Sequence, residues 1–106
     1  MRESPIERYF VKLVEKHKGK AYKWVSPGNK GVPDRLVFLC GMTFLVELKA
    51  TNGRLSAIQK VQHKKLTALG FTPVVISSTQ QAKLWVELQV SILKRMSQTP
   101  ELARFM

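Results

Sequence analysis

The stretch VPDRLVFLCGMTFLVELKA, residues 32–50, decides the fold of this chain. Two runs within it, RLVFLC and TFLVELKA, are rich in β-branched and aromatic residues, and Gly41 and Met42 lie between them. Runs of this kind on both sides of a short turn are typical of a β-hairpin. The same stretch contains Asp34 and Glu47, although the whole chain has only 7 acidic residues. Charge inside an otherwise apolar hairpin points to a special role for these two side chains.

The segments around the hairpin predict three helices and two further strands. Segment 4–19 begins with Ser4 and Pro5, which suit an N-cap and a first helical residue, and its apolar residues recur at helical spacing. The later patterns predict a strand at 21–26, a helix at 55–70, a strand covered on both faces at 73–78 and a helix at 79–96. Because a helix connects the last two strands, they should be parallel, with a right-handed crossover. We therefore expect an α/β fold of order α-β-β-β-α-β-α, in which helices flank a mixed central sheet.

Length and composition predict one basic domain. The chain has 106 residues, 44% of them hydrophobic, so we expect a single domain at 1–97 and a tail at 98–106. Its 18 Lys and Arg against 7 Asp and Glu give a net charge of +11, which favours a polyanionic partner such as nucleic acid. The chain has no membrane-length apolar run, no signal-peptide centre near its start and one cysteine, Cys40. We expect a soluble, intracellular protein that binds no membrane.

Glu47 and Lys49 form the first half of a candidate site. Side chains of a strand alternate between its faces, so these two residues share one face. A salt bridge between them, or a solvated sheet edge, is the simplest explanation of such a pair. Asp34, the only aspartate, changes the interpretation, because the hairpin register places it roughly opposite residues 47–49. Two carboxylates are thus expected to converge.

Converging carboxylates suit a divalent cation. Mg²⁺ and Mn²⁺ prefer oxygen ligands, keep open positions and accept phosphate oxygens of a substrate. The backbone carbonyl of Leu48 could supply a further oxygen. An ammonium beside such a metal can orient an attacking water and offset charge on phosphorus. The sequence therefore predicts a metal site at Asp34 and Glu47, with Lys49 in a catalytic role.

The pattern PD…E-x-K, at residues 33–34 and 47–49, resembles the VRR-NUC family, the virus-type replication and repair nucleases of the PD-(D/E)xK superfamily. PD…E-x-K alone is a weak signal, but the family pattern is longer. Its further matches here are Gly31, Arg35, Ala50 and Gln59. The resemblance covers residues 3 to about 78 and implies a restriction-endonuclease-like core.

The family pattern includes a glutamate in the first helix and a glutamine at the start of the second, which match Glu7 and Gln59. Each also completes an S-x-x-E or S-x-x-Q capping box, and one side chain can serve both purposes. Gln62 is an alternative to Gln59, because it lies near the centre of the apolar stripe of its helix, and Glu3 is a lesser alternative to Glu7. The stripe consists of Leu55, Ile58, Leu66 and Leu69.

The resemblance implies a metal-dependent endonuclease that hydrolyses phosphodiester bonds in DNA. Branched DNA, such as a Holliday junction, would be its substrate in replication, recombination or repair. Asp34 and Glu47 would hold Mg²⁺ or Mn²⁺ with help from Glu7, Lys49 would activate water, and Gln59 would orient Lys49 or that water. A homodimer is also implied, located in the host cytoplasm if a phage encodes the protein.

Several basic side chains are expected to contact DNA phosphates without reading sequence. The candidates are Lys20, Lys23, Lys30, Arg35, Lys60 and Lys64. His17 and His63 lie on separate predicted helices, each without a second ligand four residues away, so both are interpreted as surface residues.

The last helix offers apolar residues for a dimer interface, although packing onto the chain's own sheet is the favoured use. These residues are Trp85, Leu88, Ile92 and Met96. The alternative function is a non-catalytic, basic nucleic-acid-binding module in which Glu47 and Lys49 merely pair. An RNA-directed nuclease or a binder of anionic membranes is a weaker third hypothesis.

Overall fold

The computed structural model describes residues 4–50 and 53–97, so the predicted tail at 98–106 and Glu3 lie outside the described residues. Its elements are α1 (Pro5–Lys16), β1 (Lys20–Lys23), β2 (Arg35–Leu39), β3 (Met42–Leu48), α2 (Ala57–Ala68), β4 (Val74–Ile76) and α3 (Thr79–Ser97). This order confirms the predicted α/β fold. Within the described ranges, no helix is long and apolar enough to cross a membrane.

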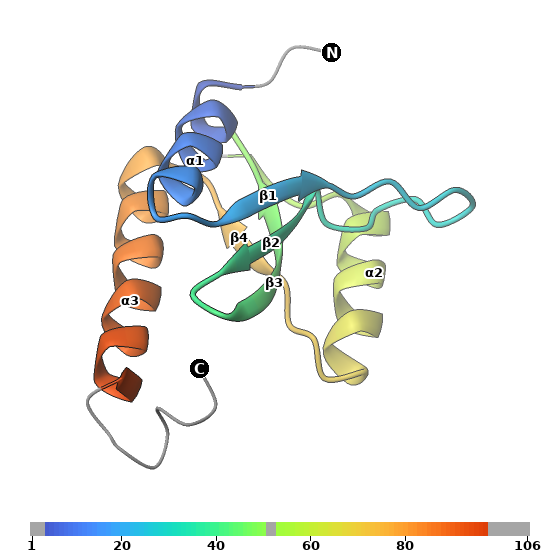
Figure 1. The fold of residues 1–106 in the computed structure, drawn as a ribbon. Helices are drawn as coiled ribbons and strands as arrows, with labels where there is room; N and C mark the ends of the chain where they lie inside the picture. Colours follow the sequence, from blue (N-terminus) through green and yellow to red (C-terminus); the bar gives the residue numbers. More distant parts are fainter. Residues whose placement is uncertain (1–3, 51–52, 98–106) are drawn as a thin grey trace.

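The four strands form one mixed sheet in the order β1-β2-β3-β4. Strands β1, β2 and β3 are antiparallel neighbours, whereas β4 runs parallel to β3, as the connection through α2 predicted. Figure 1 shows α1 and α3 together on one side of the sheet and α2 on the other side. The two faces of β3 therefore meet different helices.

The hairpin turn lies one residue earlier than predicted. Leu39 pairs with Met42, so the turn consists of Cys40 and Gly41 rather than Gly41 and Met42. Both turn residues have positive φ, 56° and 76°, as in the two-residue turns whose twist matches that of the adjoining strands. This turn also determines the register of the whole hairpin.

The apolar core lies between the sheet and the α1–α3 pair. Alternating residues of β2 and β3, such as Val37 and Val46, are buried against these helices because strand side chains alternate between faces. The Trp85 ring of α3 lies 5.9 Å from that of Phe10 and 4.8 Å from that of Phe44, measured between ring centroids. One face of the sheet thus contains most of the apolar packing, and the other face is left for polar groups.

Strand β4 differs from its prediction as a strand covered on both faces. It is an edge strand beside β3, and Val75 is exposed while Ile76 is buried. Val75 pairs with Glu47 and therefore shares its face, but α2 covers Glu47 and leaves Val75 open. The apolar run of β4 is therefore covered on one face only at Val75.

Candidate active site

Asp34 and Glu47 face each other across the open end of the hairpin. Arg35 pairs with Val46, so extending the antiparallel register by one residue puts Asp34 opposite Glu47, where the two side chains point to the same face. Asp34 Oδ2 accepts a hydrogen bond of 3.0 Å from the backbone N–H of Leu48. The structure therefore brings the two predicted carboxylates together, as the register predicted.

Glu47 is a buried carboxylate held by polar neighbours. Its exposed fraction is only 1%. Its Oε2 accepts a hydrogen bond of 3.2 Å from Gln59 Nε2 and lies 3.7 Å from the ammonium of Lys49. A buried charge requires such compensation, because loss of water costs several kcal/mol (about 2–7 even for a neutral polar group).

Burial and the neighbouring Asp34 disfavour the charged form of Glu47. Burial is the main cause that raises the pKa of Glu47 to about 7, and the negative charge of Asp34 and a hydrogen bond with it act in the same direction. The nearby ammonium of Lys49 lowers the pKa and opposes these effects. A cation bound between the carboxylates would relieve this repulsion.

The raised pKa of Glu47 predicts a pH-dependent stability in metal-free buffer. A carboxyl with an ordinary pKa near 4.5 that rises to about 7 on folding holds its proton more tightly in the folded state. The resulting stabilisation is complete below the ordinary pKa and is lost as pH rises through 7. Urea unfolding in EDTA should therefore show the parent losing up to about 1.4 kcal/mol per pH unit relative to Glu47→Gln between pH 5 and 8. A difference that stays constant over this range would contradict the burial of a titrating Glu47.

Gln59 is the glutamine that reaches the site. Its Oε1 accepts hydrogen bonds from Lys49 Nζ at 2.7 Å and from the backbone N–H of Ser56 at 2.9 Å. One side chain therefore makes both contacts that the sequence suggested: the capping contact with Ser56 and the site contact with Lys49. Gln62 is half-buried on the same helix.

Helix α2 is turned so that a polar face meets the sheet. Two residues of its predicted apolar stripe, Ile58 and Leu69, are exposed, whereas Gln59 and His63 face Glu47. The hydrogen bond from Gln59 to the buried carboxylate, with His63 beside it, therefore orients the helix more strongly than burial of the stripe, which explains why the helical wheel wrongly favoured Gln62.

Gly31 fixes the loop before Asp34 against the start of α2. Its φ is +90°, and a Cβ there would lie 2.7 Å from the carbonyl oxygen of Ile58 and 3.0 Å from the backbone nitrogen of Gln59. Gly31→Ala should therefore displace the first turn of α2. The free energy of unfolding should fall by more than the roughly 1–2 kcal/mol that a left-handed backbone conformation costs a non-glycine residue. Gly28→Ala is the matched control, because its φ is +80° and no atom lies within 4 Å of the added Cβ. Equal losses in urea unfolding would rule out the contact with α2.

Arg35 and Glu7 lie apart from the carboxylate pair. Arg35 was predicted to contact DNA, but its guanidinium is buried, with Nη2 3.0 Å and Nε 3.1 Å from Glu7 Oε2 and Nη1 3.0 Å from the carbonyl oxygen of Ala21. The prediction is corrected because Arg35 neighbours Asp34 on its strand and so points to the opposite face, toward α1. Glu7 is engaged by this guanidinium rather than by the carboxylate pair. In the described part of the chain, no group of three or more His, Cys, Asp or Glu is arranged to hold a metal.

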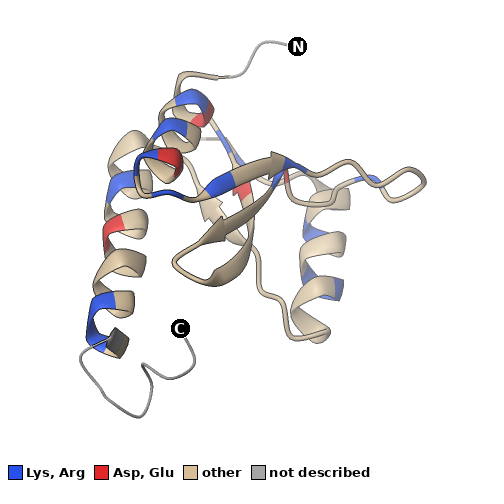
Figure 2. Ribbon diagram, in the orientation of Figure 1, with Lys and Arg blue, Asp and Glu red and all other residues tan. Residues whose placement is uncertain are grey.

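The predicted DNA-contacting lysines remain at the surface. Figure 2 shows basic residues at both ends of β1, on the loop that follows it and along α2. The exposed members are Lys20, Lys23, Lys30, Lys60 and Lys64. Lys20 also pairs with Glu15 at 3.3 Å, in an exposed contact that solvent screens.

His63 was interpreted as a surface residue, but the structure buries it. Its exposed fraction is 8%, and its Nε2 lies 3.9 Å from Glu47 Oε1. Burial and the charge of Lys49 lower the pKa of His63, while Asp34 opposes this. The sequence signal that could have revealed its position is its spacing of four residues from Gln59, which puts both side chains on one helix face.

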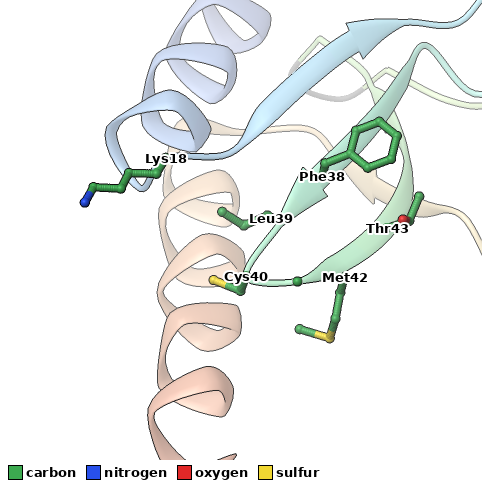
Figure 3. Close-up of a pocket in the computed structure, with 7 residues that line it drawn as sticks. Lys18, Phe38, Leu39, Cys40, Met42 and Thr43 are labelled. Carbon is green, nitrogen blue, oxygen red and sulfur yellow. The ribbon is translucent and has the colours of Figure 1, made fainter. Parts of the chain in front are cut away.

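A pocket of about 390 Å³ lies at the other end of the hairpin, around the turn at Cys40 and Gly41. Figure 3 shows Leu39 directed toward α3, whereas Phe38 and Thr43 lie on the other side of the hairpin. Partial burial raises the pKa of the Cys40 thiol. This pocket is separate from the carboxylate pair, which lies at the open end.

The donor set at the open end suits a hard divalent cation. Glu47 Oε1 is buried and has no hydrogen-bond partner among the described residues, so it is available as a ligand. Asp34 supplies a second carboxylate on the same face and accepts from the backbone N–H of Leu48, the residue whose carbonyl the sequence suggested as a further ligand. Carboxylate and carbonyl oxygens are the ligands that Mg²⁺ and Mn²⁺ prefer. An ammonium and an amide beside them can orient a water or a phosphate oxygen.

Comparison with known proteins reveals similarity in both sequence and fold. No family model matches the chain. The protein named "Putative nuclease p44" of Acyrthosiphon pisum secondary endosymbiont phage 1 is 46% identical over 79 residues, which span 74% of this chain and 85% of that protein. A solved structure described as "VRR_NUC domain" matches with a TM-score of 0.70 and 26% identity over 77% of this chain and 90% of that chain.

Proposed function

Because the chain belongs to the VRR-NUC family of nucleases, we propose that it is a divalent-metal-dependent endonuclease that hydrolyses phosphodiester bonds in DNA. The observation that supports this most directly is the pairing of Asp34 with the buried Glu47, beside the ammonium of Lys49. Two adjacent carboxylates, one of them buried with a pKa raised by burial and by its neighbour, form a poor salt-bridge partner for one lysine but a good cation site. This favours catalysis over a simple binding module.

Each side chain of the site has a role in this proposal. Asp34, Glu47 and the Leu48 carbonyl hold Mg²⁺ or Mn²⁺. When bound, the ion supplies Lewis-acid stabilisation of the charge that develops on the phosphate. Lys49 orients the attacking water and offsets the same charge, and Gln59 holds Lys49 and Glu47 in position through its two hydrogen bonds. Glu7 is left out because its carboxylate is paired with Arg35.

The charge distribution supports DNA as the substrate. The net charge of +11 and the exposed lysines of β1, the following loop and α2 suit a phosphate backbone. These lysines position DNA without reading its sequence, so selection by shape, as in branched DNA or a Holliday junction, is consistent with them. Such substrates occur in replication, recombination and repair.

A homodimer would place two such sites around a symmetric junction. Trp85 of α3 packs against Phe10 and Phe44 and is therefore not part of the proposed interface. The proposed interface consists of the exposed Leu84, Leu88 and Ile92. Together with Val75, Leu84 and Leu88 line a groove of about 340 Å³ between β4 and α3.

Sedimentation equilibrium should detect a dimer for the parent and a monomer for Leu88→Glu.

The test is cleavage of labelled branched and linear DNA by the purified protein in Mg²⁺, Mn²⁺ or EDTA, with Asp34→Asn alongside. We expect cleavage with metal only, a preference for branched DNA and no activity of Asp34→Asn. An RNA substrate is included to test whether the protein cleaves DNA in preference to RNA. The proposal fails if the parent cuts no form of DNA with either ion, or if Asp34→Asn cuts as fast as the parent.

A further inference from the structure

His63 and Glu47 present two buried polar atoms to each other. His63 Nε2 lies 3.9 Å from Glu47 Oε1, and both atoms are buried without a hydrogen-bond partner among the described residues. A separation of 3.9 Å is too long for a hydrogen bond, but a small rotation of either side chain would complete one. Buried polar atoms without a hydrogen-bond partner destabilise the folded state, so their presence in a native protein calls for a functional explanation.

The two oxygens of Glu47 have different neighbours. Oε2 accepts a hydrogen bond from Gln59 and forms an ion pair with Lys49, whereas Oε1 faces His63 Nε2. Gln59 and His63 are four residues apart on α2, so one face of this helix reaches both sides of a single carboxylate. This arrangement could hold the carboxylate plane in one orientation.

Resting on the proposed function, we propose that His63 is a positioning residue, which donates its Nε2–H to one lone pair of Glu47 Oε1 and leaves the other lone pair directed at the divalent ion. The neutral ring provides one donor without adding positive charge next to the metal. Partners that orient a metal-ligating side chain typically raise metal affinity 10- to 100-fold. His63 is not itself a ligand in this proposal, since Mg²⁺ and Mn²⁺ prefer oxygen donors.

The experiment measures ion binding to the metal-free full chain, by calorimetry for Mg²⁺ and by electron paramagnetic resonance of free Mn²⁺. His63→Phe keeps the ring size and removes the donor, His63→Gln restores an N–H donor, and His17→Phe is the control for loss of a distant histidine. Circular dichroism verifies folding, and His63→Leu replaces His63→Phe if the larger ring prevents it.

We expect His63→Phe to weaken binding of both ions about tenfold or more, with His63→Gln and His17→Phe close to the parent. Equal affinities of His63→Phe and the parent would overturn the inference and leave the proposed nuclease intact. Loss of Mn²⁺ binding alone would also overturn it, because His63 would then be a direct ligand. Absence of binding by the parent would overturn the proposed function and this inference together.

Discussion

Replacing Lys49 with methionine should lower the rate of DNA cleavage by roughly 100- to 1000-fold, the usual effect of removing one preorganised electrostatic donor. The ammonium of Lys49 lies 2.7 Å from Gln59 Oε1 and 3.7 Å from Glu47 Oε2, so it is held beside the carboxylates before substrate binds. Methionine keeps much of the side-chain volume but has no charge to orient water or to stabilise the phosphate. Single-turnover rates with saturating enzyme and Mn²⁺ would measure the change independently of DNA affinity.

The matched control for this variant is Lys30→Met, on the exposed loop before Asp34. Loss of one phosphate contact should weaken binding and reduce its salt dependence, but should not change the rate of cleavage of bound DNA. A loss of less than about tenfold for Lys49→Met, or equal losses for both variants, would show that Lys49 acts only in binding.

Arg35→Ala should lower the free energy of unfolding by about 3–5 kcal/mol, because it leaves the partner of a buried ion pair uncompensated. The side chains of Arg35 and Glu7 are exposed to only 6% and 18%, and the guanidinium also donates to the carbonyl oxygen of Ala21. Chemical denaturation would measure the loss. A loss of this size would show that Arg35 has a structural role. If Arg35 contacted DNA instead, as the sequence suggested, Arg35→Ala would change the salt dependence of DNA binding and not the stability.

The control is the exposed ion pair of Lys20 and Glu15, whose side chains are exposed to 53% and 46%. Lys20→Ala should cost less than about 1 kcal/mol, because water and salt screen exposed charges. Replacing both members of the buried pair, in Glu7→Gln with Arg35→Met, should recover part of the stability, since no unpaired charge then remains. Similar losses for Arg35→Ala and Lys20→Ala would mean that burial of the Arg35–Glu7 pair contributes little.

Local sequence patterns were sufficient for most of the fold. The hairpin, the helix that Ser4 caps and the parallel connection through α2 were predicted because periodicity, caps and turn residues act within a few residues of the chain. The approach of Asp34 to Glu47 followed from the same logic, since the register of a short hairpin follows from its turn. The one-residue error in the turn arose because Cys40 adopts a positive φ that non-glycine residues rarely take.

The sequence by itself thus determined the order of helices and strands, and the pairing of Asp34 with Glu47 across the hairpin. Only the tertiary structure decided which partner each polar side chain takes: Arg35 turns to Glu7, and Gln59 and His63 of α2 meet Glu47. The physical reason is that a buried charge must be compensated by groups from distant parts of the chain. That competition can outweigh the burial of an apolar stripe, so a helical wheel alone does not show which face of α2 turns inward.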